Sequence, residues 1–213
     1  MCGRFYVDDD TMREIERIAR KIDRQRAKTG EVFPAQPALV IQTLQGELEA
    51  HVKQWGYERT GTKSVIFNVR SETVQQRPMF DRDFEIHRCV VPAGKFFEWK
   101  KSGEKEKEKY EFYDPAGILY MAGIYHRDPS GDRFAVLTQK AQGYMEGIHD
   151  RMPLVLTADE ISEWLFSKEK AVKILEGSYV PLCSRKNAEE KRDNTKNAGT
   201  FGACTGYEQL KLF

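Results

Sequence analysis

Apolar residues recur along this chain with two different periods, one typical of helices and one typical of strands. Over residues 11–27 the spacing is helical, and a polar side chain at Asp10 or Thr11 can cap the first turn. The apolar positions there are Met12, Ile15, Ile18, Ala19 and Ile22. We therefore predict a helix over about 11–27 that packs on the surface of a core and turns a charged face to solvent.

From residue 38 to residue 138 the apolar residues fall instead into short runs, which Gly, Pro and charged turns separate. Short strands at this spacing predict an antiparallel sheet or an irregular barrel. The polar segment 100–109 joins two of the runs and predicts a solvated hairpin tip. The runs are ALVIQTL, VIFNV, RCVVP, KFFEW, YEFYD, ILYMAGIY and RFAVLT.

Helical signals return after residue 156. Thr157 and Glu160 form a capping-box pattern before an apolar stretch. The segment 167–177, SKEKAVKILEG, predicts a further helix that stops at Gly177. Residues 185–197 are polar and uncapped, so we predict a mobile loop or linker there. Strand-like runs followed by helices indicate an α+β protein.

Composition excludes several classes of protein. Apolar residues make up 40% of the chain and charged residues 31%, as in ordinary soluble domains. The net charge is only +1, so a nucleic-acid surface must be a local patch. No stretch approaches the roughly 18 apolar residues of a membrane span, and MCGRFYVDDD does not resemble a signal peptide. We expect a cytoplasmic protein with no membrane partner.

The four cysteines and four histidines give no metal signal, because they contain no C-x-x-C pair and no zinc-like spacing. We therefore expect no metal and no other cofactor. Cys2 is the cysteine with unusual chemistry, since loss of Met1 would give it a free α-amine beside its thiol. Part of such an amine is neutral at physiological pH, and a neutral amine converts an aldehyde into an imine. The thiol can then close a five-membered thiazolidine ring.

A ring-opened abasic deoxyribose presents an aldehyde of this kind. An N-terminal nucleophile hydrolase, such as a glutamine amidotransferase, would also use an N-terminal cysteine. The cysteine alone therefore leaves both classes of enzyme open.

Short motifs along the rest of the chain carry a resemblance. In order they are MCGR at the start, F-P-A-Q (33–36), W-G (55–56), N-x-R-x-E (68–72), P-x-x-x-F-F-E-W (92–99) and H-D-R-M-P (149–153). Together they resemble the SRAP (SOS response-associated peptidase) family over nearly the whole chain. The family often has P-T-Q where this chain has Pro34-Ala35-Gln36, so one local hydroxyl is missing here.

The resemblance implies a single domain over 1–213 of α+β class. Its core would be a distorted, mostly antiparallel β-barrel or sheet flanked by helices. It also implies a positively charged groove for single-stranded DNA, a thiazolidine link from mature Cys2 to an abasic site, and, in some members, autoproteolytic release of Met1. Such a protein would act as a DNA-damage shield with lyase-like and peptidase character.

The resemblance assigns the remaining catalytic roles by position. Asn68 would orient the α-amine of Cys2. Glu98 would exchange protons during amine activation and dehydration of the carbinolamine. His149 would protonate the sugar ring oxygen during ring opening. Without the resemblance, structural roles would be favoured for both Glu98 and His149.

Arginine and aromatic side chains near these motifs are candidates for DNA contacts. Guanidinium groups bind phosphate in a fork, and aromatic faces stack on unpaired bases. Arg151 would either bind phosphate or pair with Asp150. The DNA-binding candidates are Arg4, Arg70, Trp99, Arg151 and, in the pocket wall, Thr138. Trp55 and Phe33 are further candidates for stacking, with core packing as the alternative for Trp55.

The last five residues, 209–213, read QLKLF and resemble the peptide that binds the bacterial sliding clamp. Gln209 would hydrogen-bond at the edge of an apolar groove that takes up the apolar side chains, namely Leu210, Leu212 and Phe213. Lys211 departs from the usual pattern, and the alternative is a terminal segment packed on the protein's own core.

Three hypotheses follow from the sequence. The first is a monomeric protein that cross-links abasic single-stranded DNA through Cys2 and is associated with the nucleoid when bound. The second is a peptidase or amidohydrolase that uses the same cysteine. The third is a non-covalent single-strand binding module tethered to the clamp.

Overall fold

The computed structural model describes residues 2–22, 27, 29–59, 61–62, 64–102 and 107–187. The helices are α1 (Asp9–Ile18), α2 (Pro78–Ile86), α3 (Ala158–Phe166) and α4 (Lys168–Leu175), with 3-10 turns η1 (Ser71–Gln76) and η2 (Gly143–Met145). The strands are β1 (Phe5–Val7), β2 (Lys21–Ile22), β3 (Gly30–Val32), β4 (Pro37–Leu44), β5 (Glu47–Trp55), β6 (Tyr57–Glu58), β7 (Val65–Ile66), β8 (Asn68–Arg70), β9 (Arg88–Ala93), β10 (Lys95–Lys101), β11 (Lys107–Tyr113), β12 (Leu119–His126), β13 (Arg133–Lys140), β14 (Arg151–Pro153), β15 (Val155–Leu156) and β16 (Cys183–Lys186).

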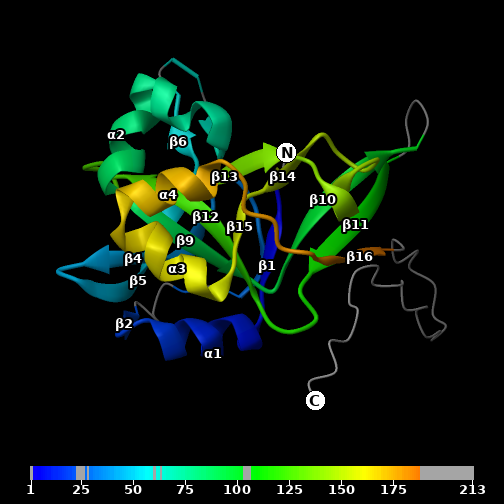
Figure 1. The fold of residues 1–213 in the computed structure, drawn as a ribbon, viewed down its shortest axis with the longest axis horizontal. Helices are drawn as coiled ribbons and strands as arrows, with labels where there is room; N and C mark the ends of the chain where they lie inside the picture. Colours follow the sequence, from blue (N-terminus) through cyan, green and yellow to red (C-terminus); the bar gives the residue numbers. More distant parts are fainter. Residues whose placement is uncertain are drawn as a thin grey trace.

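Two mostly antiparallel sheets form the body of the molecule (Figure 1). The larger sheet runs β14-β13-β12-β9-β4-β5-β2, with β8 and β15 attached. A short parallel pairing, Phe134 with Trp55, joins β13 to β5 and closes the path of strands into a ring. The second sheet runs β16-β11-β10-β1-β3. The chain is thus of α+β class with a mainly antiparallel core, as predicted.

The ring strands are apolar on both faces because each face meets another layer. In β9 all six residues are buried. Cys89 and Val91 belong to a cluster that also contains Phe5 and Phe96 of the second sheet. Val90 belongs to a cluster with side chains of the helices, including Trp164. Near-continuous apolar runs are expected for strands covered on both sides.

The helix predicted over 11–27 is shorter and begins earlier. The carboxylate of Asp8, and not Asp10 or Thr11, accepts from the Thr11 N–H at 2.8 Å and caps α1. The helix ends at Ile18, and residues 21–22 form β2 beside β5. The prediction was wrong because Ala19 fits the helical spacing of apolar residues, whereas in the structure it is buried in extended backbone. Residues 23–26 lie outside the described part of the chain.

Most of the other predicted elements are confirmed. All seven apolar runs fall largely in strands, with VIFNV divided between β7 and β8, and Thr157 and Glu160 form the capping box at α3. Lys101 pairs with Lys107 in the predicted hairpin, whose residues 103–106 are not described. The predicted loop 185–197 was wrong at its start, because residues 185–186 pair with β11 as the end of β16. Residues 188–197 lie outside the described part.

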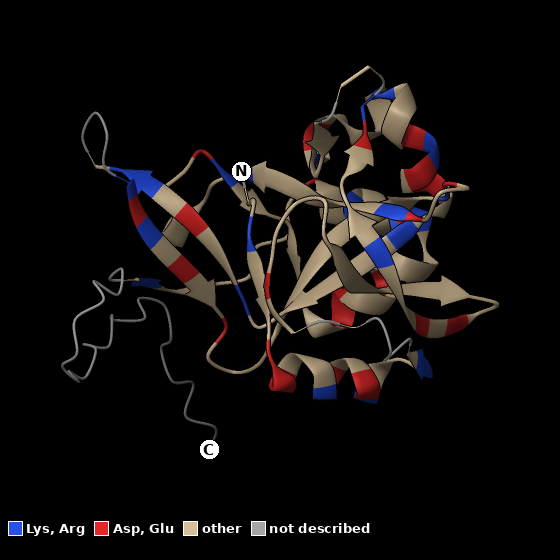
Figure 2. Cartoon of the chain, turned by 180° about the vertical axis from the view of Figure 1, so that it is seen from behind, with Lys and Arg blue, Asp and Glu red and all other residues tan. Residues whose placement is uncertain are grey.

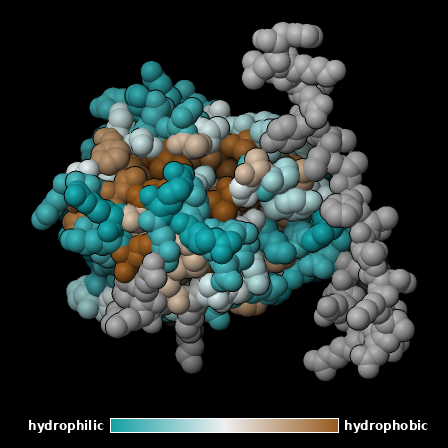
Figure 3. All heavy atoms as spheres, turned by 90° about the horizontal axis from the view of Figure 1, so that it is seen from below, coloured by the Kyte–Doolittle hydropathy of each residue, from teal (hydrophilic) through white to brown (hydrophobic). Residues whose placement is uncertain are grey.

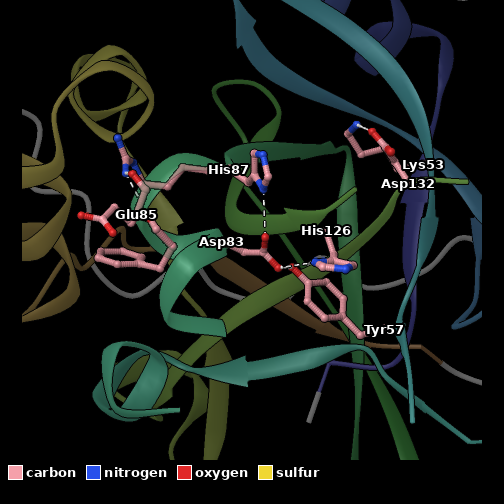
Figure 4. A network of polar contacts seen from close by, with 9 residues as sticks. Lys53, Tyr57, Asp83, Glu85, His87, His126 and Asp132 are labelled. Carbon is pink, nitrogen blue, oxygen red and sulfur yellow. Dashed lines mark hydrogen bonds and ion pairs between the residues drawn. The ribbon is translucent and has the colours of Figure 1, made fainter. Parts of the chain in front are cut away.

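A buried carboxylate ties α2 to the ring (Figure 4). Asp83, 3% exposed, lies 2.9 Å from Nδ1 of His87 and 3.0 Å from Nδ1 of His126. Its Oδ2 also accepts from the Tyr57 hydroxyl at 3.1 Å. Side chains from the C-cap of α2, from β6 and from β12 thus converge on the Asp83 carboxylate. This network holds the three elements together.

The surface around α1 mixes apolar and polar side chains. Figure 3 views this side of the molecule, where hydrophilic side chains lie over and between apolar ones. Within the described residues, no helix is long and apolar enough to cross a membrane.

Candidate active site

Cys2 lies just before β1 and has no exposed surface. It packs in the cluster between the two sheets, beside Phe5 and Met145 among others. Its S–H donates to the carbonyl of Arg4 at 3.7 Å. Burial, followed by the nearby charge of Glu98, raises the pKa of the Cys2 thiol well above its ordinary value. The thiol is therefore protonated at rest, and a nucleophilic step needs a base.

Asn68 contacts Cys2 directly, although 66 residues separate them in the sequence. Its Nδ2–H donates to the Cys2 carbonyl at 2.8 Å. Pairing of β8 with Val136 of β13 fixes the position of Asn68 on the ring. The other end of the same amide, Oδ1, is buried and accepts no hydrogen bond from the described residues. An acceptor beside the Cys2 backbone is thus available for a further N–H.

Glu98 lies in β10 and is 3% exposed. Alternate residues of a strand share a face, so Glu98 points to the same side as Phe96, which packs in the Cys2 cluster. The Glu98 carboxylate is therefore directed toward the side on which Cys2 is buried. Trp99 points to the opposite face of the strand.

His149 lies in the loop between η2 and β14, and Met145 and Ile148 of this segment pack against the Cys2 cluster. The ring is partly exposed, at 26%. Its Nδ1 accepts from the Arg151 N–H at 3.0 Å and also lies 2.8 Å from the Asp150 carboxylate. The first contact uses a lone pair on Nδ1, whereas a hydrogen bond to Asp150 would use a proton there.

The structure brings Arg4, Phe33 and Trp99 together, as a phosphate and base site would require. The Arg4 guanidinium lies 4.4 Å from the Phe33 ring centre and 4.8 Å from that of Trp99. An ion pair with Glu31 at 3.3 Å also holds it. Arg70 lies exposed at the end of β8, two residues after Asn68.

Arg151 makes a different ion pair from the one predicted. It donates to both carboxylate oxygens of Glu72, at 2.5 and 2.8 Å, and to the carbonyl of Thr138 at 2.5 Å. Pairing with Asp150 was therefore wrong for Arg151, because its guanidinium is turned to η1 and β13. Thr138 is 1% exposed and lies under this contact.

Trp55 is a core residue and not a stacking face. It has no exposed area, and its Nε1–H donates to the Phe67 carbonyl at 2.9 Å. The Pro34-Ala35-Gln36 turn packs against its backbone, since Ala35 N–H donates to the Trp55 carbonyl at 2.7 Å. Ala35 has φ +67°, which an L residue other than Gly seldom adopts.

Sequence reasoning missed the two carboxylates that hold the arginines, Glu31 and Glu72. Glu72 ends the N-x-R-x-E motif, so its motif position was a usable signal. Glu31 is one residue before the buried Val32 and carried no local signal.

The described residues contain no group of three or more His, Cys, Asp or Glu that could hold a metal. A cavity of about 500 Å³ lies between α1, β12 and α3, with Glu14, Tyr120 and Thr157 in its wall. Cys2, Asn68, Glu98 and His149 do not line it. The segment 209–213 lies outside the described residues.

These features define an α+β protein with a buried cysteine at position 2, whose carbonyl accepts from an asparagine and whose cluster lies on the same side of β10 as a buried glutamate. The chain belongs to the SOS response associated peptidase (SRAP) family, whose model matches residues 1–189. It is 31% identical over 200 residues to the abasic site processing protein YoqW of Bacillus subtilis, covering 85% of this chain and 87% of that one. It is 28% identical over 199 residues to the abasic site processing protein YoaM of the same organism, covering 85% and 86%.

Solved structures share the fold. A crystal structure of a protein from Bacteroides thetaiotaomicron has a TM-score of 0.73 at 22% identity, covering 88% of this chain and 93% of that chain.

Proposed function

We propose that this protein binds single-stranded DNA at abasic sites and links covalently to them through Cys2, once Met1 has been removed. The observation that supports this most is the Asn68 amide on the Cys2 carbonyl, with Glu98 buried on the face of β10 that is directed to the Cys2 cluster. The relatives YoqW and YoaM are named abasic site processing proteins, which supports the same substrate.

The proposed reaction joins an aminothiol and an aldehyde with loss of one water. The Cys2 amine attacks the sugar C1′, so that a C–N bond forms and the carbonyl oxygen takes a proton. Loss of that oxygen as water gives an iminium. Sulfur then adds to the same carbon, and the S–H proton passes to a base. The sum is a thiazolidine and one water, and no electrons are gained or lost.

The side chains around Cys2 supply the proton transfers. Glu98 takes a proton from the attacking amine and returns one to the departing water. The free Oδ1 of Asn68 accepts an N–H of the amine, while its Nδ2 keeps the Cys2 carbonyl in place. His149 protonates the sugar ring oxygen during opening, since imidazole is the commonest general acid in proteins.

Removal of Met1 is a condition of this proposal, because in its presence the Cys2 nitrogen belongs to a peptide bond. Cys2 is also without exposed surface in the chain that begins at Met1. Loss of the preceding residue would free the amine. We propose that the family's self-processing activity can perform this cleavage, which would account for the peptidase name.

The DNA contacts are proposed for Arg4, Arg70 and Trp99, with Phe33 beside them. Arg70 is exposed and near Asn68, so a phosphate next to the lesion can reach it. Arg151, with Thr138 beneath it, would shape the pocket wall, since the Glu72 ion pair engages its guanidinium.

Incubation of the processed protein with an abasic single-stranded oligonucleotide tests the proposal. We expect a heat-stable adduct whose mass equals protein plus DNA minus one water. Cys2→Ala and a form that retains Met1 should give no adduct. An absent adduct from correctly processed protein overturns the proposal. Turnover of an amide without an adduct would favour the hydrolase, and binding without an adduct would favour the non-covalent module.

The remaining predictions are proposals of the same kind. We propose one domain over 1–213, a monomer that works in the cytoplasm on DNA, and a clamp-binding tail at 209–213. Deletion of 209–213 should abolish co-elution with the purified sliding clamp and leave cross-linking intact. Unchanged co-elution would contradict the tail's role.

A further inference from the structure

One face of the five-stranded sheet concentrates positive charge. Strand register places Lys95 beside Tyr6, Trp99 beside Lys109, and Glu111 between Phe97 and Arg185. This outer face is opposite to Phe96 and Glu98, which point to the Cys2 cluster. Its six cations are Arg4, Lys95, Lys101, Lys107, Lys109 and Arg185, and its two carboxylates are Glu31 and Glu111.

The two carboxylates orient the cations without neutralising them. Glu111, with its side chain 2% exposed, accepts from Lys95 at 2.9 Å and from Nε of Arg185 at 2.6 Å. Glu31 pairs with Lys109 at 3.0 Å and with Arg4 at 3.3 Å. Each carboxylate thus serves two cations, so each group keeps an excess positive charge. Figure 2 shows the alternating basic and acidic bands on this sheet.

Aromatic rings fix the positions of the ammonium groups. Lys109 Nζ lies 4.1 Å from the Phe97 ring centre, and Lys95 Nζ lies 5.3 Å from that of Tyr6. Arg4 lies against Trp99 at the same edge. A cation over a ring face is held in place and keeps its charge. The face therefore presents cations already in place for an anionic partner.

At the hairpin end, Lys101 and Lys107 lie directly opposite each other. Both are exposed, and neither makes an ion pair with another described residue. Like charges directly opposite in a sheet are destabilising. A bound anion would relieve this repulsion.

We propose that this outer face is a second DNA contact, which holds the phosphates of the single strand that flanks the abasic nucleotide. The inference rests on the proposed function. The outer face favours a nucleic acid as its partner, because its cations are continuous with the Arg4–Trp99 pair and alternate with aromatic rings. The span from Lys95 to Lys101 is about 20 Å of strand, so the contact extends well beyond one nucleotide. Since the whole chain carries only +1, this concentration of charge is local.

The test changes the two lysines at the hairpin end together, Lys101→Glu with Lys107→Glu. The matched control is Arg82→Glu with Lys173→Glu, which makes the same charge change on exposed residues of α2 and α4. The probe is a fluorescent 20-nucleotide oligothymidylate without an abasic site. The Kd is measured between 50 and 300 mM NaCl, and the melting temperature of each variant checks its folding.

We expect the hairpin variant to bind about tenfold more weakly at 100 mM NaCl, and its salt slope to fall by about 1.4, or two phosphate contacts at roughly 0.7 each. Lys101→Arg with Lys107→Arg should keep wild-type binding. An unchanged Kd and slope, or an equal loss in the control variant, overturns the proposal. So does an equal loss toward a polyglutamate peptide of the same charge, which would show recognition of anions in general.

The two proposals can fail separately. Because the probe has no aldehyde, binding to the outer face is measured without the Cys2 reaction. If the wild-type protein forms no adduct with abasic DNA, the cross-linking chemistry is wrong. If the hairpin variant still binds the oligothymidylate more weakly than wild type in that case, the outer-face contact stands.

Discussion

At the residue scale, one amide controls the position of Cys2. The Asn68 Nδ2–H donates to the Cys2 carbonyl, while its Oδ1 stays available. Glu98 is the carboxylate in the proposed proton transfers, and it is buried. A small displacement of the Cys2 nitrogen would change the distance between that nitrogen and the Glu98 carboxylate. Positioning is therefore expected to matter as much as basicity.

We predict that Asn68→Asp slows cross-linking about 10- to 100-fold. The change removes the donor to the Cys2 carbonyl and places a second acceptor beside it, a loss of roughly 1–3 kcal/mol for a buried group. Single-turnover rates with abasic DNA measure this. Cross-linking at the wild-type rate, or a slower rate explained entirely by partial unfolding in circular dichroism, would contradict the positioning role.

Sequence alone nominated Cys2, Asn68, Glu98 and His149 because motifs mark them. It did not give the partner of Arg151, because Glu72 is 79 residues away and the contact depends on the pairing of β8 with β13. Contacts of this kind follow from the tertiary fold and have no local signal.

At the element scale, α1 is anchored to the ring by one carboxylate. Glu14 accepts from the Tyr120 hydroxyl of β12 at 2.7 Å and from Arg17 within the helix at 2.6 and 2.8 Å. These hydrogen bonds, first from Arg17 and then from Tyr120, lower the pKa of Glu14 from 4.5 to about 2. A lowered pKa in the folded state stabilises the protein above the ordinary value, and this contribution is lost as pH falls toward 2.

We predict that Glu14→Gln lowers the free energy of unfolding by about 1 kcal/mol at pH 7, a modest figure because Arg17 is largely exposed. The difference from wild type should shrink between pH 4.5 and pH 2. Urea denaturation across this range measures it, with Glu176→Gln, exposed at the end of α4, as the control. A difference that is constant with pH would rule out the charge of Glu14 as the cause.

The buried carboxylate of α2 makes a second prediction. Asp83→Ala would leave the Tyr57 hydroxyl and the two imidazoles of His87 and His126 without their acceptor. We expect a loss of about 3 kcal/mol, since a buried group deprived of its partner is costly. Asp81→Ala, exposed in the same helix, is the control and should change stability by less than about 0.5 kcal/mol. Equal losses in the two variants would show that the network contributes nothing specific.

The strands could be predicted from the sequence because short apolar runs bounded by turn residues are a local signal, but the end of α1 could not. Residues 19–22 suit either a helix or a strand, and the backbone bond from Arg20 N–H to the Leu48 carbonyl decides between them. That bond joins residues 28 apart, so no local pattern contains it.

At the scale of the whole molecule, a short parallel contact closes the ring. Phe134 of β13 pairs with Trp55 of β5, and their rings stack at 6.2 Å. The sequence predicted a sheet or a distorted barrel but not which strands close it, because parallel partners need long connections and carry no turn signal. The buried Trp55 therefore belongs to the fold, whereas Trp99, on the outer face of the second sheet, belongs to the proposed DNA surface.

This contrast gives a matched pair of substitutions. Trp55→Ala should cost about 3–5 kcal/mol, because it empties a fully buried site at the ring closure. Trp99→Ala should leave the melting temperature nearly unchanged and weaken single-strand binding by about 1–3 kcal/mol through lost stacking. Thermal denaturation and the Kd for an oligothymidylate are measured on both variants. If Trp99→Ala lost stability while keeping DNA affinity, the outer face would be structural, and the path proposed for the strand would have to lie elsewhere.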